Sequence, residues 1–213
     1  MASTTRTVLL TGFGPFPGVP ENATARLVPV LAERARATFP GVAIHTEIFD
    51  TTWTSAPQRA AALIAEHRPT LALHFGVARE ARGFQIERQA QNLCRIDADA
   101  AGDLPLSAKL DHRGPDVRPA ALDADAIAAH LAACGFPVSL SDDAGAYLCN
   151  AVLYHSLAAV EALSDAPGAA CHSGFIHIPA DLSRPPLPFP RAVDGALEIV
   201  RSCLGQIERI QKL

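Results

Sequence analysis

Short apolar runs alternate with amphipathic segments along this chain, and this alternation constrains its fold more than any other feature. Strand-like runs are predicted at 7–12, 42–49 and 70–76, and apolar residues recur at helical spacing within 27–35. Strands that are apolar along most of their length are typical of a parallel sheet with both faces covered by helices. We therefore expect an α/β fold, a three-layer α/β/α sandwich with a mostly parallel, twisted central sheet.

The second half of the chain continues the pattern. A helix is predicted between an Asp123 cap and a stop at Gly135, and a strand follows at 137–141. The stretch "SDDAGAYLCNAVLYH" (141–155) predicts another helix, and "CHSGFIHIP" predicts another strand. The last helix is predicted from apolar residues spaced by three and four positions: Val193, Leu197, Val200, Leu204 and Ile207.

Proline and glycine mark the expected interruptions. Pro29 should kink or delay the first helix. The polar stretch 77–118 should be mainly loop with an excursion of strand, and the Pro-rich stretch 184–190 should be a rigid surface connection. Because no linker or internal repeat appears, residues 1–213 are expected to form a single domain.

Composition and charge exclude several classes of function. The 213 residues carry a formal net charge of −4 without a basic run, which argues against a nucleic-acid partner. No apolar run approaches the roughly 18 residues of a membrane span, and the N-terminus lacks a signal pattern. The five cysteines form no C-x-x-C pair. We therefore expect a cytoplasmic protein with reduced thiols.

Neither a metal nor a cofactor is expected. No two Cys or His residues stand at finger-like spacing, and His172 with His177 makes only a weak pair. Gly12 and Gly14 suggest a dinucleotide-binding turn, but proline occupies position 17, where the third glycine would stand.

Cys149 lies near the predicted start of a helix. A thiol in the first turn of a helix meets the positive end of the helix dipole, which favours the thiolate. Asp142 and Asp143 are natural N-caps for this helix, and Gly145 permits a tight turn before it. Two interpretations remain open at this point: Cys149 is a nucleophile, or it is a small apolar residue packed in the core.

Two further residues are candidates for a site with Cys149. His177 lies at the end of an apolar strand. Because α/β proteins bind their ligands at the carboxyl ends of the strands, His177 is the best candidate for a base. Glu87, in "GFQIERQAQN" (83–92), would either orient the imidazole or contact the substrate. The alternative for Glu87 is a surface ion pair with Arg88 or Arg82, and the sequence alone favours that alternative.

The loop "TGFGPFPGVPENAT" (11–24) follows the first strand and carries Phe13 and Phe16. Held by glycine and proline at the end of a strand, the two rings would form an apolar slot for a small flat ligand. The alternative is that both rings pack into the core.

Four segments together resemble the pyroglutamyl peptidase I family, the pyrrolidone-carboxylate cysteine peptidases. They are "LLTGFGPF" with "NAT", "IERQAQN", "AGAYLCN" with "VLYH", and "GFIHIP", and they occur in the family's order from about residue 7 to 180. The resemblance implies an α/β/α sandwich that removes an N-terminal pyroglutamyl residue from peptides. Its expected partners are therefore N-terminally pyroglutamylated peptides, and a homo-oligomer is a further option because family members often assemble.

The resemblance also implies roles for individual residues. Cys149 would be the nucleophile that forms a thioester, His177 its base and Glu87 the acidic third member. Phe13 and Phe16 would flank the lactam ring, and Asn22 matches the asparagine of that loop.

The sequence departs from the family pattern in two places. Ala81 stands where many bacterial members have arginine, and Asn22-Ala23-Thr24 replaces the usual Asn-Pro-Ser. These departures bear on substrate contacts and on loop geometry. Two alternatives are kept: an inactive homologue that binds pyroglutamyl-like ligands, and another α/β hydrolase acting on a small neutral cyclic ligand.

Overall fold

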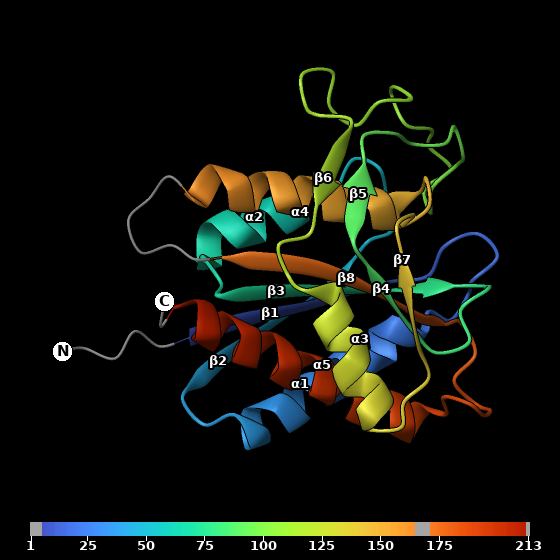
Figure 1. Cartoon of the computed structure of the whole chain (residues 1–213). Coiled ribbons are helices and arrows are strands. Elements are labelled where there is room, and N and C mark those ends of the chain that lie inside the picture. The colour runs from blue at the N-terminus through green and yellow to red at the C-terminus, as the bar shows by residue number, and fades with distance from the viewer. Residues whose placement is uncertain (1–5, 165–170, 212–213) are drawn as a thin grey trace.

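The computed structural model describes residues 6–164 and 171–211 (Figure 1). Its strands are β1 (Arg6–Phe13), β2 (Val42–Phe49), β3 (Leu71–Ala78), β4 (Phe84–Glu87), β5 (Gln89–Gln91), β6 (Val117–Pro119), β7 (Val138–Ser141) and β8 (His172–Pro179). Its helices are α1 (Ala23–Thr38), α2 (Ala56–His67), α3 (Ala124–Ala133), α4 (Leu148–Ser164) and α5 (Phe189–Ile210).

The central sheet has six strands in the order β2-β1-β3-β8-β4-β7. Four of its pairings are parallel, and only β4 with β8 is antiparallel. Figure 1 shows α2 and α4 on one face of this sheet and α1, α3 and α5 on the other. The expected three-layer α/β/α sandwich with a mostly parallel sheet is confirmed. Strands β5 and β6 pair separately as a small antiparallel ribbon beside α4.

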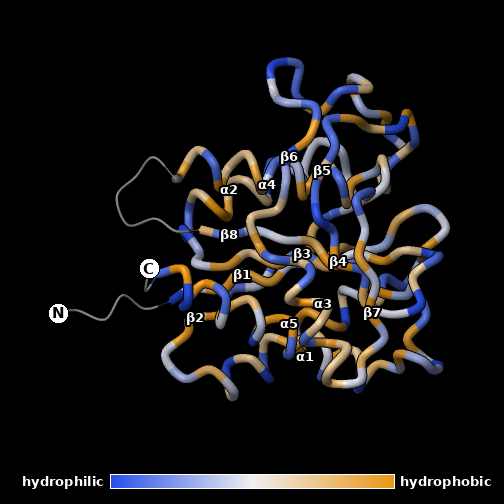
Figure 2. Tube along the Cα trace, viewed as in Figure 1, coloured by the Kyte–Doolittle hydropathy of each residue, from blue (hydrophilic) through white to orange (hydrophobic). Residues whose placement is uncertain are grey.

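Two apolar clusters fill the spaces between the layers. One packs the sheet against α1, α3 and α5, and the other packs it against α2 and α4. Strand β1 contributes to both, because Val8 and Leu10 face the first cluster and Leu9 faces the second. Figure 2 shows hydrophobic residues along the strands of the central sheet, whereas β5 is hydrophilic. Among the described helices, none combines the length and the apolarity that a bilayer crossing requires.

The predicted cap of α3 is confirmed. Asp123 caps α3 by accepting a hydrogen bond from the backbone N–H of Ala126. Pro29 does not delay the first helix, since α1 begins at Ala23 and continues through this residue. Pro29 is exposed, so the carbonyl of Ala25 that loses its intrahelical partner is on the solvent side.

The two irregular stretches contain more structure than expected. Residues 77–118 include β4, β5 and the start of β6, so the expected excursion of strand is confirmed. The stretch 184–190 is not only a surface connection: Leu187 is buried and Phe189 begins α5. A proline in the first turn of a helix is well tolerated because its missing N–H would have no partner there.

Candidate active site

The Cys149 thiol lies over the centre of the sheet, beside His177. Cys149 is the second residue of α4, and His177 is in β8 directly opposite Gly76 of β3. A Cβ atom built on Gly76 would lie only 3.0 Å from the Cys149 sulfur. The absence of a side chain at Gly76 therefore gives the thiol room to approach the sheet where His177 stands, and the two side chains are hydrogen-bonded.

Glu87 holds the other side of the His177 ring. Its Oε1 lies 2.7 Å from His177 Nδ1, and both side chains are almost completely buried. The antiparallel pairing of β4 with β8 sets Gln85 opposite His177. Because alternate residues of a strand face the same side, Glu87 projects toward α4 together with His177. The structure thus brings the three predicted catalytic residues into one chain of contacts.

The His177 imidazole is held in its charged form. Burial lowers the pKa of His177, but the charge and hydrogen bond of Cys149 and the hydrogen bond and charge of Glu87 raise it to about 9. A buried imidazole between a sulfur and a carboxylate is suited to proton transfer, because each of its two ring nitrogens has a partner.

Glu87 is not the surface residue that its sequence context suggested. Arg88 instead forms ion pairs with Asp125 and Asp142. Burial alone would raise the pKa of Glu87, but the hydrogen bond and charge of His177 and the hydrogen bond from Gln85 hold it below its usual value. The side chain of Gln85 donates to Glu87 Oε1 at 2.9 Å. Glu87 is therefore a buried carboxylate that orients His177.

The aspartates before Cys149 do not cap its helix. Helix α4 begins at Leu148, several residues after Asp142 and Asp143. Asp143 instead accepts a hydrogen bond from the backbone N–H of Gly145, whose φ of +79° gives the tight turn that was expected. The first backbone N–H groups of α4 have no acceptor within the helix and stand beside the Cys149 sulfur. They form a potential site for an oxyanion.

The two loop phenylalanines occupy different environments. Phe13 is 2% exposed and packs between Phe49 and Phe175, so it belongs to the core cluster under α2 and α4. Phe16 is half-buried, and its ring centroid is 5.9 Å from that of Tyr147. Tyr147 is close enough to Cys149 for the two groups to interact electrostatically, so Phe16 and Tyr147 form an aromatic wall near the thiol. Sequence reasoning missed Tyr147, although an aromatic residue so close to Cys149 was the available signal.

Asn22 fixes the shape of the loop that carries the phenylalanines. Its Oδ1 accepts hydrogen bonds from the backbone N–H and the hydroxyl of Thr24, at 3.1 and 2.8 Å. Its Nδ2 donates to the carbonyl of Gly14 at 3.1 Å. These contacts give Asn22 a positioning function as the N-cap of α1. Direct contact of Asn22 with a substrate stays a prediction.

The altered segment after β3 reaches this same loop. A Cβ atom on Gly18 would lie 2.9 Å from Nη2 of Arg79, so the exposed Arg79 side chain crosses to the first loop. Arg79 therefore forms part of the surface beside the phenylalanine loop.

A buried aspartate in the long loop was also missed. Asp99 is fully buried and accepts hydrogen bonds from the backbone N–H groups of Trp53, Ala101 and Asp103 at 2.8 to 3.0 Å. Burial would raise the pKa of Asp99, but these backbone donors lower it. The Trp53 ring in turn packs edge-on against Tyr147, with centroids 5.1 Å apart. Asp99 thus supports the aromatic wall from behind.

His74 is close to the site but is a different kind of histidine. It is completely buried, its Nδ1 lies 2.7 Å from the hydroxyl of Thr11, and burial lowers its pKa to about 3. His74 is therefore neutral at ordinary pH and packs as part of the core near Phe175.

Comparison with known proteins identifies a common family. A family model described as "Pyroglutamyl peptidase" matches residues 6–184. A pyrrolidone-carboxylate peptidase of Cupriavidus pinatubonensis is 34% identical over 177 residues, which cover 82% of this chain and 78% of that protein. A pyrrolidone-carboxylate peptidase of Pectobacterium carotovorum is 31% identical over 212 residues, which cover 94% of each chain.

Solved structures agree at the level of the fold. The pyroglutamyl peptidase I of Bacillus amyloliquefaciens superposes with a TM-score of 0.78 at 23% identity, covering 94% of this chain and 97% of that one. The pyrrolidone carboxyl peptidase of Thermococcus litoralis gives a TM-score of 0.81 at 24% identity, covering 96% of each chain. At such identities the likeness shows the architecture.

Proposed function

This chain belongs to the pyroglutamyl peptidase family of cysteine omega-peptidases, and we propose that Cys149, His177 and Glu87 perform its reaction. The reaction is the removal of a pyroglutamyl residue from the N-terminus of a peptide. The observation that carries this proposal is the arrangement of a helix-start thiol beside an imidazole that a buried carboxylate holds at 2.7 Å.

In the first half of the reaction, the Cys149 thiolate attacks the pyroglutamyl carbonyl carbon. The carbonyl oxygen becomes an oxyanion, which the free N–H groups at the start of α4 stabilise. The His177 imidazolium then gives its Nε2 proton to the departing amine as the C–N bond breaks. The shortened peptide leaves, and the pyroglutamyl group remains on Cys149 as a thioester.

In the second half, neutral His177 accepts a proton from a water molecule. The water oxygen attacks the thioester carbonyl, and the C–S bond breaks to release pyroglutamic acid and regenerate the thiolate. Glu87 keeps the proton of the imidazole on Nδ1 and stabilises the imidazolium that forms in this half of the cycle.

Recognition of the substrate follows from the chemistry of its ring. Pyroglutamate carries a neutral lactam in place of an N-terminal ammonium, so its binding site needs apolar walls and hydrogen bonds to an amide. The aromatic wall of Phe16 and Tyr147 supplies an apolar surface beside Cys149. Phe13 supports the floor of the site by packing against Phe175, whose ring is 4.9 Å from that of His177.

Two wider features belong to the same proposal. We treat residues 1–213 as one peptidase domain, since β1 pairs with β3 and β3 with the C-terminal strand β8. A cytoplasmic site of action agrees with the five cysteines, all of which are free thiols. The substrates are N-terminally pyroglutamylated peptides, and assembly into a homo-oligomer stays a prediction. The comparisons lend no support to the two alternatives, an inactive homologue or a different hydrolase.

Release of a fluorophore from a pyroglutamyl amide tests the proposal. The parent protein, Cys149→Ser and His177→Ala are compared, with Cys134→Ser as the control for loss of an exposed thiol away from the site. An alanyl amide with a free amino group is the specificity control. We expect cleavage of the pyroglutamyl substrate alone, lost in the first two variants and retained in the third. Absence of cleavage by folded parent protein would overturn the assignment of activity.

A further inference from the structure

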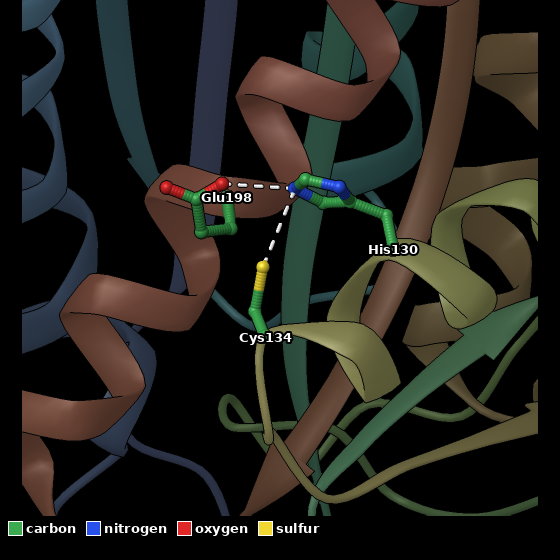
Figure 3. A group of neighbouring side chains, drawn as sticks. All are labelled: His130, Cys134 and Glu198. Atoms are coloured by element: carbon green, nitrogen blue, oxygen red, sulfur yellow. Dashed lines mark hydrogen bonds and ion pairs between the residues drawn. The ribbon is translucent and has the colours of Figure 1, made fainter.

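A second cluster of reactive side chains lies on the opposite face of the sheet from Cys149. His130 is in α3, Cys134 is the C-cap residue of the same helix, and Glu198 is in the neighbouring helix α5 (Figure 3). The ligand atoms of these three residues all lie within 4.8 Å of one another. Among the described residues, this is the one group in which each of three such side chains offers a single ligand atom within 4.8 Å of the other two.

The three side chains point at a common centre. His130 Nε2 lies 2.8 Å from Glu198 Oε2 and 3.9 Å from Cys134 Sγ. Figure 3 shows the imidazole nitrogen between the carboxylate oxygen and the sulfur. Cys134 is exposed, and the other two residues are half-buried, so an ion has access from solvent.

We propose that His130, Cys134 and Glu198 bind one zinc ion, with water as the fourth ligand. Imidazole nitrogen, thiolate sulfur and carboxylate oxygen are the three donor types that zinc accepts, and three protein ligands with an open position make a common tetrahedral site. This site lies outside the peptidase machinery and does not depend on the proposed function.

The observed separations require only small movements. Zinc–ligand bonds of about 2.0 to 2.3 Å in a tetrahedron place neighbouring ligand atoms about 3.3 to 3.7 Å apart. The contact between His130 and Glu198, at 2.8 Å, would open by about half an ångström, and the His130–Cys134 distance, at 3.9 Å, would close slightly. The separation between Cys134 Sγ and Glu198, which is within 4.8 Å, would close by up to about 1.2 Å, and all three adjustments are within the reach of side-chain rotation.

The surrounding structure fixes the ligands. Helix α3 ends in a Schellman motif, in which Phe136 N–H donates to the carbonyl of Leu131 and Gly135 N–H donates to that of Ala132. This motif holds Cys134 at the negative end of the α3 dipole, where a cation is favoured. Arg201 binds Glu198 through the other carboxylate oxygen, Oε1, at 3.3 Å. Its contact leaves Oε2 directed toward His130.

Binding of the metal displaces protons. Zinc coordinates a thiolate and a lone pair on His130 Nε2, so Cys134 releases its thiol proton to solvent and the imidazole carries its remaining proton on Nδ1. The ion thus replaces the hydrogen bond that now joins Nε2 to Glu198. In doing so it links α3 to α5, and we expect it to stabilise the folded state.

Cobalt(II) provides a spectroscopic probe for this site. The full chain carrying Cys149→Ala is stripped with a chelator, so that the catalytic thiol cannot contribute, and is titrated with Co²⁺. We expect one ion per chain, with a thiolate-to-cobalt charge-transfer band and the intense visible bands of tetrahedral cobalt. Added Zn²⁺ should remove these bands, and Zn²⁺ should raise Tm.

The decisive variant in this background is Cys134→Ala, because it leaves the His130–Glu198 ion pair in place. It should abolish the charge-transfer band and weaken metal affinity by at least tenfold, since even residues that only orient metal ligands contribute 10- to 100-fold. His130→Ala should weaken binding similarly, whereas His112→Ala removes an exposed histidine outside the cluster and should change nothing. A band that survives Cys134→Ala, or saturation only at millimolar metal, would overturn the proposal.

Discussion

Replacement of Glu87 by glutamine tests whether a buried carboxylate keeps His177 protonated beside Cys149. The amide of Glu87→Gln has nearly the same shape, and its carbonyl oxygen still accepts a hydrogen bond from His177 Nδ1. The substitution therefore removes a negative charge from a fully buried position and leaves packing almost unchanged. Changes in activity or pKa in this variant can therefore be assigned to loss of the negative charge of Glu87.

The size of the expected change in the pKa of His177 can be derived from its value in the parent protein. A value of about 9, against an ordinary value of 6.5, means that the surroundings favour the imidazolium by roughly 3 kcal/mol, at about 1.4 kcal/mol per pKa unit. A hydrogen bond to a charged group contributes about 1.5–3 kcal/mol, and a neutral partner contributes about half as much. Glu87→Gln should therefore lower the pKa of His177 by about one unit.

The contributions of His177 to stability and to activity should both be lost at alkaline pH. Because folding raises the pKa of His177, its contribution to stability is complete below pH 6.5 and is lost as the pH rises through about 9. The protonated imidazole is also the form that donates to the leaving amine, so the activity of the parent protein should fall on the alkaline side as His177 loses its proton. In Glu87→Gln this alkaline limb should move to lower pH.

The assay is kcat/KM for a pyroglutamyl amide, measured from below pH 6.5 to above pH 9. Alkylation of Cys149 by iodoacetamide over the same range reports the state of the thiol–imidazole pair without turnover. We expect kcat/KM to fall about 100-fold or more, in the range for loss of a positioned acid–base group. Glu33→Gln, on the exposed side of α1, is the matched control. An alkaline limb that stays in place would refute the assignment of Glu87.

Three further substitutions give separate tests. Asp99→Ala leaves three backbone donors without their acceptor, so it should lower the free energy of unfolding by roughly 2–4 kcal/mol, measured by urea titration, and should raise KM. Unchanged stability would contradict the supporting role of Asp99. Gly76→Ala places a Cβ atom 2.7 Å from the Phe175 ring and 3.0 Å from the Cys149 sulfur, and should reduce kcat/KM by at least about tenfold while the circular dichroism spectrum is retained. Full activity would contradict the described packing of Phe175 and the thiol against Gly76. Gly83→Ala places a Cβ atom 2.2 Å from the carbonyl oxygen of Pro137 and should lower the stability of the fold by about 2–4 kcal/mol, measured by thermal unfolding. A Tm equal to that of the parent protein would show that the backbones at Gly83 and Pro137 are not as close as described.

Local signals in the sequence were sufficient for the class of fold and for several elements. The Asp123 cap and the apolar spacing from Val193 to Ile207 predicted α3 and α5, because caps and periodicity act within a few residues. The antiparallel direction of β4 was not predictable in this way. It depends on which strands flank it, and the four residues Phe84–Glu87 carry no signal for the direction of their partners.

The same limit explains which parts of the site were predictable. Cys149 and His177 stand at a helix start and near a strand end, positions that sequence patterns indicate. The local context of Glu87 favoured a surface ion pair, and only the resemblance to the family placed it in the site, because its burial arises only when β4 pairs on both edges. Asp142 and Asp143 looked like caps, but Asp143 closes its own turn with Gly145 instead.

The expectation that the chain binds no metal rested on the lack of finger-like spacings and on the weakness of the pair His172 and His177. His130 and Cys134 are four residues apart, a spacing that places two side chains on one face of a helix. The third residue, Glu198, comes from a different helix that is distant in the sequence. A pair of this kind is therefore a weak signal until the packing of the two helices is known.

Because the active site depends on the antiparallel pairing of β4 with β8, we expect peptidase activity to appear late in the folding of the chain. Glu87 and His177 are 90 residues apart in the chain, and they meet across a pairing in which only Gln85 with His177 and Ile86 with Ile176 are joined. Contacts between such distant segments form slowly, because a long loop must close first. A nascent or partly refolded chain would thus carry the thiol and the imidazole without the carboxylate that orients His177. Recovery of peptidase activity during refolding should follow the formation of the helices, so turnover would report completion of the whole sheet.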